Sequence, residues 1–244
     1  MSILLEELKQ IKLLELNFFG IDISISNGVI TVFAAAFLVI LFYSILSRRA
    51  KIIPDSLQGA VEYIIQFIRE EMLAPLGREG ESWIPFVVAL FSFILTCNLL
   101  GLIPGLLPPT SNINVTATLA VMVFVITQAA GFRKHGFIGY IRTLFPVGIP
   151  LVVAIFLFPI EIIGQLARPF SLAIRLFANM FAGHAIILTL LGLIYVFKSY
   201  LVIPFPVMGT TAILAFEIFV SFIQAFIFAF LSASYIVGAL KTEH

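Results

Sequence analysis

Two apolar tracts of unusual length close the chain and limit the folds that it can adopt. They cover residues 147–197 and 203–240. A straight helix of about 50 residues would be about 75 Å long, whereas the hydrocarbon core of a bilayer is about 30 Å thick. Each tract is therefore either broken into two ordinary spans or forms one strongly tilted helix of a long hairpin. Pro159 and Pro169 could break the first tract, but the second has no proline after Pro206, so we favour the tilted hairpin.

The composition places the whole chain in a membrane. Hydrophobic residues make up 61% of it and charged residues 11%, against about 25% charged residues in soluble domains. The apolar segments are too long for the strands of a membrane barrel. We therefore predict an all-α multi-pass membrane protein with a single membrane domain over residues 1–244. Cys97 is the only cysteine, so no internal disulfide can form.

Three shorter spans and one surface helix precede the long tracts. The first span, 29–46, is followed by a cluster of basic residues. Residues 55–73 carry apolar side chains on one face and charged ones on the other, which predicts an amphipathic helix at the membrane interface. The second and third spans are predicted at 85–103 and 115–131. The predicted bundle thus has about three conventional spans, the interfacial helix and the hairpin.

The distribution of lysine and arginine predicts the orientation. Basic residues follow the first and third spans, and the loop 104–114 has none. By the positive-inside rule the N-terminus lies outside and the C-terminus in the cytoplasm. The tail 1–27 is then outside, and the apolar spacing of Leu4–Leu16 predicts a helix on the membrane surface. The start of the chain has no leader pattern, so we expect no cleaved signal.

Polar side chains form one stripe along each long tract, at steps of three and four residues. The first stripe consists of Glu161, Gln165, Arg168, Leu172, Arg175, Asn179 and Ala182. The second consists of Glu217, Ser221, Gln224, Phe228, Leu231 and Tyr235. An arginine at bilayer depth costs about 2.5–3.5 kcal/mol, and apolar runs flank Arg175 on both sides. We interpret it as a functional charge, the alternatives being snorkelling to the interface or a structural ion pair.

A hairpin with its turn near residue 200 brings polar groups of the two tracts to the same depth. His184 and Glu217 should be level on the outer side, and Arg175 and Gln224 near the middle of the membrane. Protonatable groups in sequence through a bilayer indicate a proton relay, although each could also be a structural polar residue. Arginine does not release its proton, so we interpret Arg175 as an electrostatic gate.

The segment Ser171–His184 resembles the signature of subunit a of the rotary F-type ATP synthase, also called ATPase subunit 6, nearly residue for residue. Residues 224–228, 98–104 and 159–161 also resemble segments of that family, and the resemblance covers the chain from about residue 50. It implies that Arg175 is the essential arginine facing the ring of c subunits. It implies that Gln224 lies beside Arg175 and that Asn179, His184 and Glu217 line an outer half-channel, to which we also assign Ser221 and Gln224. We assign the inner half-channel to Glu161, Gln165, Arg168 and Tyr235.

The resemblance implies a proton-translocating stator subunit that is not catalytic on its own. Its expected partners are the c ring, the b-subunit peripheral stalk, the rest of the F1Fo complex and the lipid bilayer, with no nucleic acid, cofactor or metal. We expect a bacterial plasma membrane, with the mitochondrial inner membrane as the alternative. Small residues should permit close approach of ring helices: Ala173, Ala178, Ala182 and Gly183.

A secondary ion transporter or channel is the alternative function, because it too would hold charges within the membrane. Such transporters show broken helices and internal repeats, and we recognise no repeat in this sequence. An intramembrane hydrolase fits less well, since three histidines and no His-Glu-x-x-His motif leave little for metal or triad chemistry.

Overall fold

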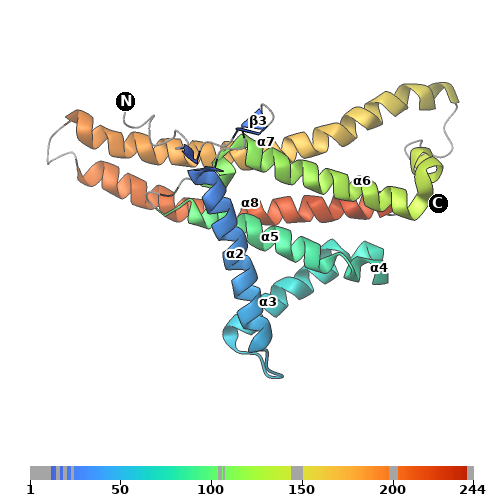
Figure 1. The fold of residues 1–244 in the computed structure, drawn as a ribbon, viewed down its shortest axis with the longest axis horizontal. Coiled ribbons are helices and arrows are strands. Elements are labelled where there is room, and N and C mark those ends of the chain that lie inside the picture. The colour runs from blue at the N-terminus through green and yellow to red at the C-terminus, as the bar shows by residue number, and fades with distance from the viewer. Residues whose placement is uncertain are drawn as a thin grey trace. The chain divides into compact units, whose positions relative to one another are not determined.

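A computed structural model of the protein describes residues 12–14, 17–18, 21–22, 25–103, 106, 108–143, 151–197 and 203–240. Helices dominate this part of the chain (Figure 1). The helices are α2 (Asn27–Arg48), α3 (Ser56–Phe67), α4 (Arg78–Glu81), α5 (Ile84–Leu100), α6 (Ile113–Thr143), α7 (Leu151–Phe197) and α8 (Pro204–Leu240). Short π- or 3₁₀-helical turns are η1 (Ile68–Met72), η2 (Ala74–Leu76) and η3 (Pro109–Ser111).

The length and hydropathy of the helices confirm a multi-pass membrane protein. Four segments in the described residues are long and apolar enough to cross a bilayer: Gly28–Arg48, Ile113–Tyr140, Phe156–Ile194 and Pro204–Leu240. The helix Ile84–Leu100 is also apolar but shorter. It begins close to the predicted second span and ends three residues before its predicted end at residue 103.

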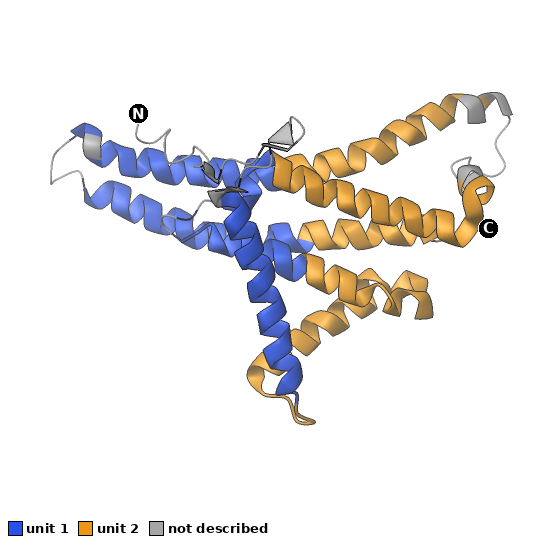
Figure 2. Ribbon diagram, in the orientation of Figure 1, with its two compact units in different colours: residues 1–50, 91–113, 176–226 blue, residues 51–90, 114–175, 227–244 orange. Residues whose placement is uncertain are grey.

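The chain forms two compact units, which Figure 2 distinguishes by colour. Unit 1 comprises residues 1–50, 91–113 and 176–226. Unit 2 comprises residues 51–90, 114–175 and 227–244. The helices α5, α7 and α8 each contribute residues to both units.

The long tract before residue 200 is one helix, not two spans. α7 contains 47 residues, including Pro159 and Pro169, and would measure about 70 Å at the usual rise. In unit 1 it lies beside α8: a Cβ placed on Gly209 would lie 3.3 Å from Leu190, and one on Gly183 would meet Glu217. The two residues of each pair lie at nearly equal distances along the chain from residue 200, as expected for a hairpin with its turn there. The tilt of the hairpin in the membrane stays a prediction.

Unit 1 also joins α2 and α5 to this hairpin. The Tyr43 hydroxyl and the Ser92 hydroxyl, from α2 and α5, are 2.7 Å apart. The rings of Phe91 on α5 and Phe222 on α8 meet edge to face, with centroids 5.7 Å apart. Aromatic pairs in this geometry add about 0.5–1.5 kcal/mol beyond the burial of their area. α5 is thereby fixed against α8 within this unit.

Unit 2 packs α6 and the end of α8 around a small apolar cluster. Its buried members are Ala130, Ile236 and Leu240, and the partly buried Leu76, Trp83 and Phe86 cover it. The predicted interfacial segment 55–73 is helical over residues 56–72, where α3 passes directly into the π-helical η1 at Ile68. Its amphipathic character is present: Val61, Ile68 and Met72 are buried, and the Glu70 side chain is exposed.

The predicted third span is part of a longer helical segment. α6 (Ile113–Thr143) consists of two helices joined by a kink at Gly136 (φ 68°, ψ 170°), and the first of them extends a few residues beyond Gly131. The basic residues after residue 131 do not break it, because their side chains reach outward; Lys134 pairs with Glu79. A positive φ is accessible to glycine without steric cost, so the chain bends at Gly136 instead.

The N-terminal tail departs from the predicted surface helix where it is described. Lys12–Leu14 (β1) pair antiparallel with Ile25–Ser26 (β4), and Asn17–Phe18 (β2) pair with Ile21–Asp22 (β3). The alternation of isoleucine with polar residues over 21–26 has the period of a strand. That local pattern prevails over the helical spacing of Leu4–Leu16, whose other residues lie outside the described ones.

Candidate functional site

The carboxyl group of Glu217 is buried in unit 1. Only 7% of the residue is exposed, although it lies in the apolar helix α8. Gly183 on α7 makes the space for it: a Cβ added at Gly183 would overlap Oε1 of Glu217 and lie 2.6 Å from its Cδ. Oε2 has no hydrogen-bond partner within the described chain. A buried carboxyl group without a partner is costly unless it binds water or a proton.

A hydrogen-bonded chain of side chains ends one helical turn from Glu217. Asn98 on α5 is fully buried; its Nδ2 donates to the backbone oxygen of Ser221 at 3.4 Å. The Thr110 hydroxyl in η3 donates to Oδ1 of Asn98 at 2.8 Å. The Ser221 hydroxyl itself is buried and has no partner within the described part of unit 1. We call Asn98, Thr110, Gly183, Glu217 and Ser221 the Glu217 cluster.

The loop after α5 brings Thr110 over Asn98. A Cβ on Gly101 would overlap Pro108, so only glycine permits the chain to return this closely. The site prediction did not include Asn98, Thr110 or Gly183. The segment 98–104 had been noted only for its family resemblance, and a single asparagine in an apolar helix indicates no partner by itself.

The other residues predicted for the outer half-channel also lie in unit 1. Gln224 is buried, and Asn179 and His184 are partly exposed. His184 and Glu217 were predicted to lie at the same depth. Gly183 faces Glu217, so His184, the next residue, lies within one residue of that predicted depth. Gly183 was expected to admit a ring helix, but its missing side chain instead admits α8 of the same chain.

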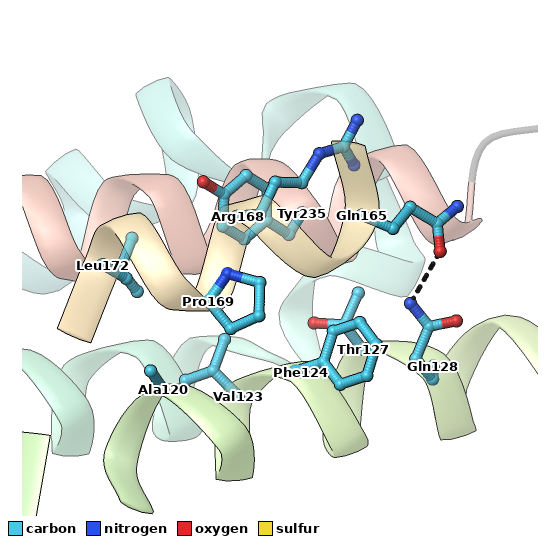
Figure 3. A pocket seen from close by; sticks show the side chains of 10 residues that line it. All are labelled: Ala120, Val123, Phe124, Thr127, Gln128, Gln165, Arg168, Pro169, Leu172 and Tyr235. Atoms are coloured by element: carbon cyan, nitrogen blue, oxygen red, sulfur yellow. Dashed lines mark hydrogen bonds between the residues drawn. The ribbon is translucent and has the colours of Figure 1, made fainter. Parts of the chain in front are cut away.

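A second polar cluster lies in unit 2 around Arg168 (Figure 3). An Arg168 nitrogen, Nη2, is 3.8 Å from Oε1 of Glu161, and the guanidinium carbon lies 5.5 Å from the centre of the Tyr235 ring. Gln128 on α6 donates to Oε1 of Gln165 at 3.0 Å. Since both charged side chains are about half exposed, their pairing contributes only about 0–1 kcal/mol.

These groups border a cavity of about 20 Å³, which we call the Arg168 cavity. It is lined by Ala120, Val123, Phe124, Thr127, Gln128, Gln165, Arg168, Pro169, Leu172 and Tyr235. The structure thus brings together three of the residues predicted for the inner half-channel around one cavity. The fourth, Glu161, reaches Arg168 across two turns of α7.

Arg175 is exposed on α7 in unit 2. Among the described residues no carboxylate lies within ion-pair distance of its guanidinium. The alternative of a structural ion pair within the described chain therefore finds no support.

In the described part of the chain, no group of three or more histidine, cysteine, aspartate or glutamate side chains gathers in a way that could hold a metal ion. The carboxyl, hydroxyl and amide groups of the Glu217 cluster and of the Arg168 cavity, together with water, suit the movement of protons.

Comparison with known proteins gives concordant matches. The family model described as ATP synthase A chain matches residues 29–237. ATP synthase subunit a of Chloroherpeton thalassium is 41% identical over 230 residues, which are 92% of this chain and 69% of that protein. ATP synthase subunit a 2 of Chlorobium luteolum is 43% identical over 93% of this chain and 67% of its own. A Wolbachia (subsp. Brugia malayi) ATP synthase subunit a is 38% identical over 97% and 98%.

Proposed function

Because this chain belongs to the ATP synthase subunit a family, we propose that it provides two offset half-channels to the carboxylates of a c ring, with Arg175 as the charge that separates them. Its expected place is the plasma membrane of a bacterium, with the N-terminus outside and the C-terminus in the cytoplasm. The observation that carries the proposal is the buried Glu217 carboxyl group with its unpartnered Oε2.

The outer half-channel is assigned to the Glu217 cluster with Asn179, His184 and Gln224. A proton arriving through water is taken up by Oε2 of Glu217 or by the His184 imidazole, since both side chains can bind and release a proton. The unpartnered hydroxyl of Ser221 can hold the water that carries the proton onward. From there the proton reaches a carboxylate of the ring.

Arg175 separates the two paths by its charge. A ring carboxylate that has taken up a proton is neutral and can face lipid, whereas an ionised one cannot do so cheaply. After nearly a full turn the carboxyl group meets the permanent cation, releases its proton and passes as an ion pair. The exposure of Arg175 and its lack of a carboxylate partner within the described residues support this role.

The inner half-channel is assigned to the Arg168 cavity together with Glu161. A released proton passes by the Tyr235 hydroxyl and the Gln165 amide to the half-exposed Glu161 carboxylate. Arg168 keeps its own proton, and its Nη2 lies 3.8 Å from Oε1 of Glu161. A membrane potential of 100 mV supplies about 2.3 kcal/mol per proton, which gives the movement its direction.

The proposed partners are the c ring, the b-subunit peripheral stalk and the remainder of the F1Fo complex. A preparation solubilised in mild detergent should contain an oligomeric c ring and the soluble ATPase head with this chain. A transporter or channel would purify alone or as a homo-oligomer, and that result would contradict the assembly.

Exchanging the pair tests the outer half-channel. The single changes His184→Glu and Glu217→His each leave two like groups at one level. The double exchange restores one carboxyl and one imidazole group. In a double-mutant cycle the double variant should therefore lose less proton pumping than either single variant. Additive losses across the cycle would show that the two residues do not act together.

A further inference from the structure

The hydroxyl of Thr127 on α6 has no partner although it is buried. The residue is only 6% exposed, and its Oγ1 makes no hydrogen bond within the described residues. Threonines in membrane helices usually bond back to the carbonyl oxygen four residues earlier. Thr118, Thr189 and Thr211 do so here, at 2.7 to 2.9 Å. Thr127 does not, and it lines the Arg168 cavity (Figure 3).

The surroundings of Thr127 suit a water molecule. The cavity volume of about 20 Å³ exceeds the roughly 10–15 Å³ that one water needs. The cavity is also lined by Gln128 and Gln165, whose amides are hydrogen-bonded to each other, and by Tyr235 and Arg168. A buried water typically makes about three hydrogen bonds, which this set can supply with Thr127.

We propose that Thr127 and the Gln128–Gln165 amide pair bind an ordered water in the Arg168 cavity, and that α6 thereby contributes positioning residues to the inner proton path. This inference rests on the function proposed above. The water accepts a proton on its oxygen from one side and gives up another on the far side, so that one O–H bond forms as another breaks. Thr127 holds the water between the tyrosine and the amide pair without itself changing its protonation state.

The sequence contains the signal for this site only in part. Thr127 and Gln128 are two adjacent polar residues that follow the apolar run 119–126 of this span. Their partners Gln165 and Tyr235 lie 37 and 107 positions further on from Gln128, so only the folded unit shows that they border one space.

The access of silver ions to a cysteine introduced at position 127 tests the site directly in the assembled complex. In a background in which Cys97, the single native cysteine, is replaced by alanine, Thr127→Cys places a thiol in the cavity. Silver ions added to F1-stripped vesicles should then block passive proton conductance. The matched control is Met122→Cys, at an exposed position on the face of the same helix opposite the residues that line the cavity; silver should leave its conductance unchanged. Equal responses of the two variants would overturn the inference.

A second pair of variants separates the hydroxyl from the shape of the side chain. Thr127→Val keeps the volume and loses the hydroxyl, and should lower proton conductance about fivefold, the rate equivalent of about 1 kcal/mol for one hydrogen bond. Thr127→Ser should retain most of it. Thr211→Val, whose hydroxyl bonds its own helix, is the control and should have no effect. Conductance that is equal in Thr127→Val and Thr127→Ser would overturn the inference.

These outcomes are distinguishable from failure of the proposed function. If unmodified vesicles conduct protons but the Thr127 variants behave as their controls do, only the water site is wrong. If unmodified vesicles holding the complex conduct no protons, the half-channels themselves are wrong.

Discussion

Replacing Gly183 by alanine should disable the outer half-channel while leaving the fold nearly intact. The new methyl group would overlap Oε1 of Glu217 and lie 2.6 Å from its Cδ. An ordinary carbon–carbon contact is about 3.5–4.0 Å, so the carboxyl group must retreat by about 1 Å. A misplacement of that size in a positioned reactive group can lower a rate about 100-fold. We expect passive proton conductance to fall by about 10- to 100-fold.

The stability of the complex should change far less. The atoms that must move are the flexible end of a glutamate side chain, and a strained rotamer costs about 0.5–1.5 kcal/mol. Alanine recovers up to about 1 kcal/mol of helix propensity relative to glycine. The net change is therefore close to zero, and the complex should retain its c ring and its thermal transition.

Proton conductance in F1-stripped vesicles is the assay, with Gly164→Ala as the matched control. Gly164 lies in the same helix, and an added Cβ there meets nothing within 4 Å, so conductance should stay at the unmodified level. Adding Glu217→Asp to Gly183→Ala shortens the acid by one methylene and should recover part of the loss. Equal conductance in Gly183→Ala and Gly164→Ala would refute the reasoning.

Two further predictions concern packing. Asn98→Leu leaves the Thr110 hydroxyl and the Ser221 backbone oxygen without their buried partner, so it should destabilise the purified complex by about 1–3 kcal/mol in thermal unfolding; an unchanged midpoint would contradict the hydrogen-bonded chain. Gly131→Ala places a methyl group against the Tyr140 ring. Because overpacking strains a core, this variant should lower the free energy of unfolding by about 1–3 kcal/mol. Recovery of stability by a smaller side chain at Tyr140 would support that cause, and no loss in the first place would exclude it.

The elements along the chain were largely predictable because they depend on local hydrophobicity. α2, α7 and α8 begin and end within about four residues of the predicted spans. The continuity of α7 followed from comparing its length with the bilayer, although two prolines lie within it. The end of α6 was not predictable in this way. Basic residues mark where a membrane span stops, but they do not stop a helix, and the bend depends on the backbone of Gly136.

The candidate site was predictable where its residues recur along one helix face. Glu217 and Ser221 lie one turn apart on α8, and their burial agrees with the stripe. The partners of these residues come from α5, η3 and α7, and no periodicity relates them. Thr110 reaches Asn98 only because Gly101 and Pro108 fold the loop back. Gly183 carries no side chain whose chemistry could have indicated its role beside Glu217.

The central claim is that one permanent cation keeps the two half-channels apart, and ATP synthesis by complexes carrying Arg175→Ala tests it most directly. Such complexes, reconstituted with a c ring and the ATPase head, should make no ATP when a proton gradient is imposed across the vesicle membrane. Unmodified complexes prepared in parallel should make it. ATP synthesis by the Arg175→Ala complexes would contradict the account.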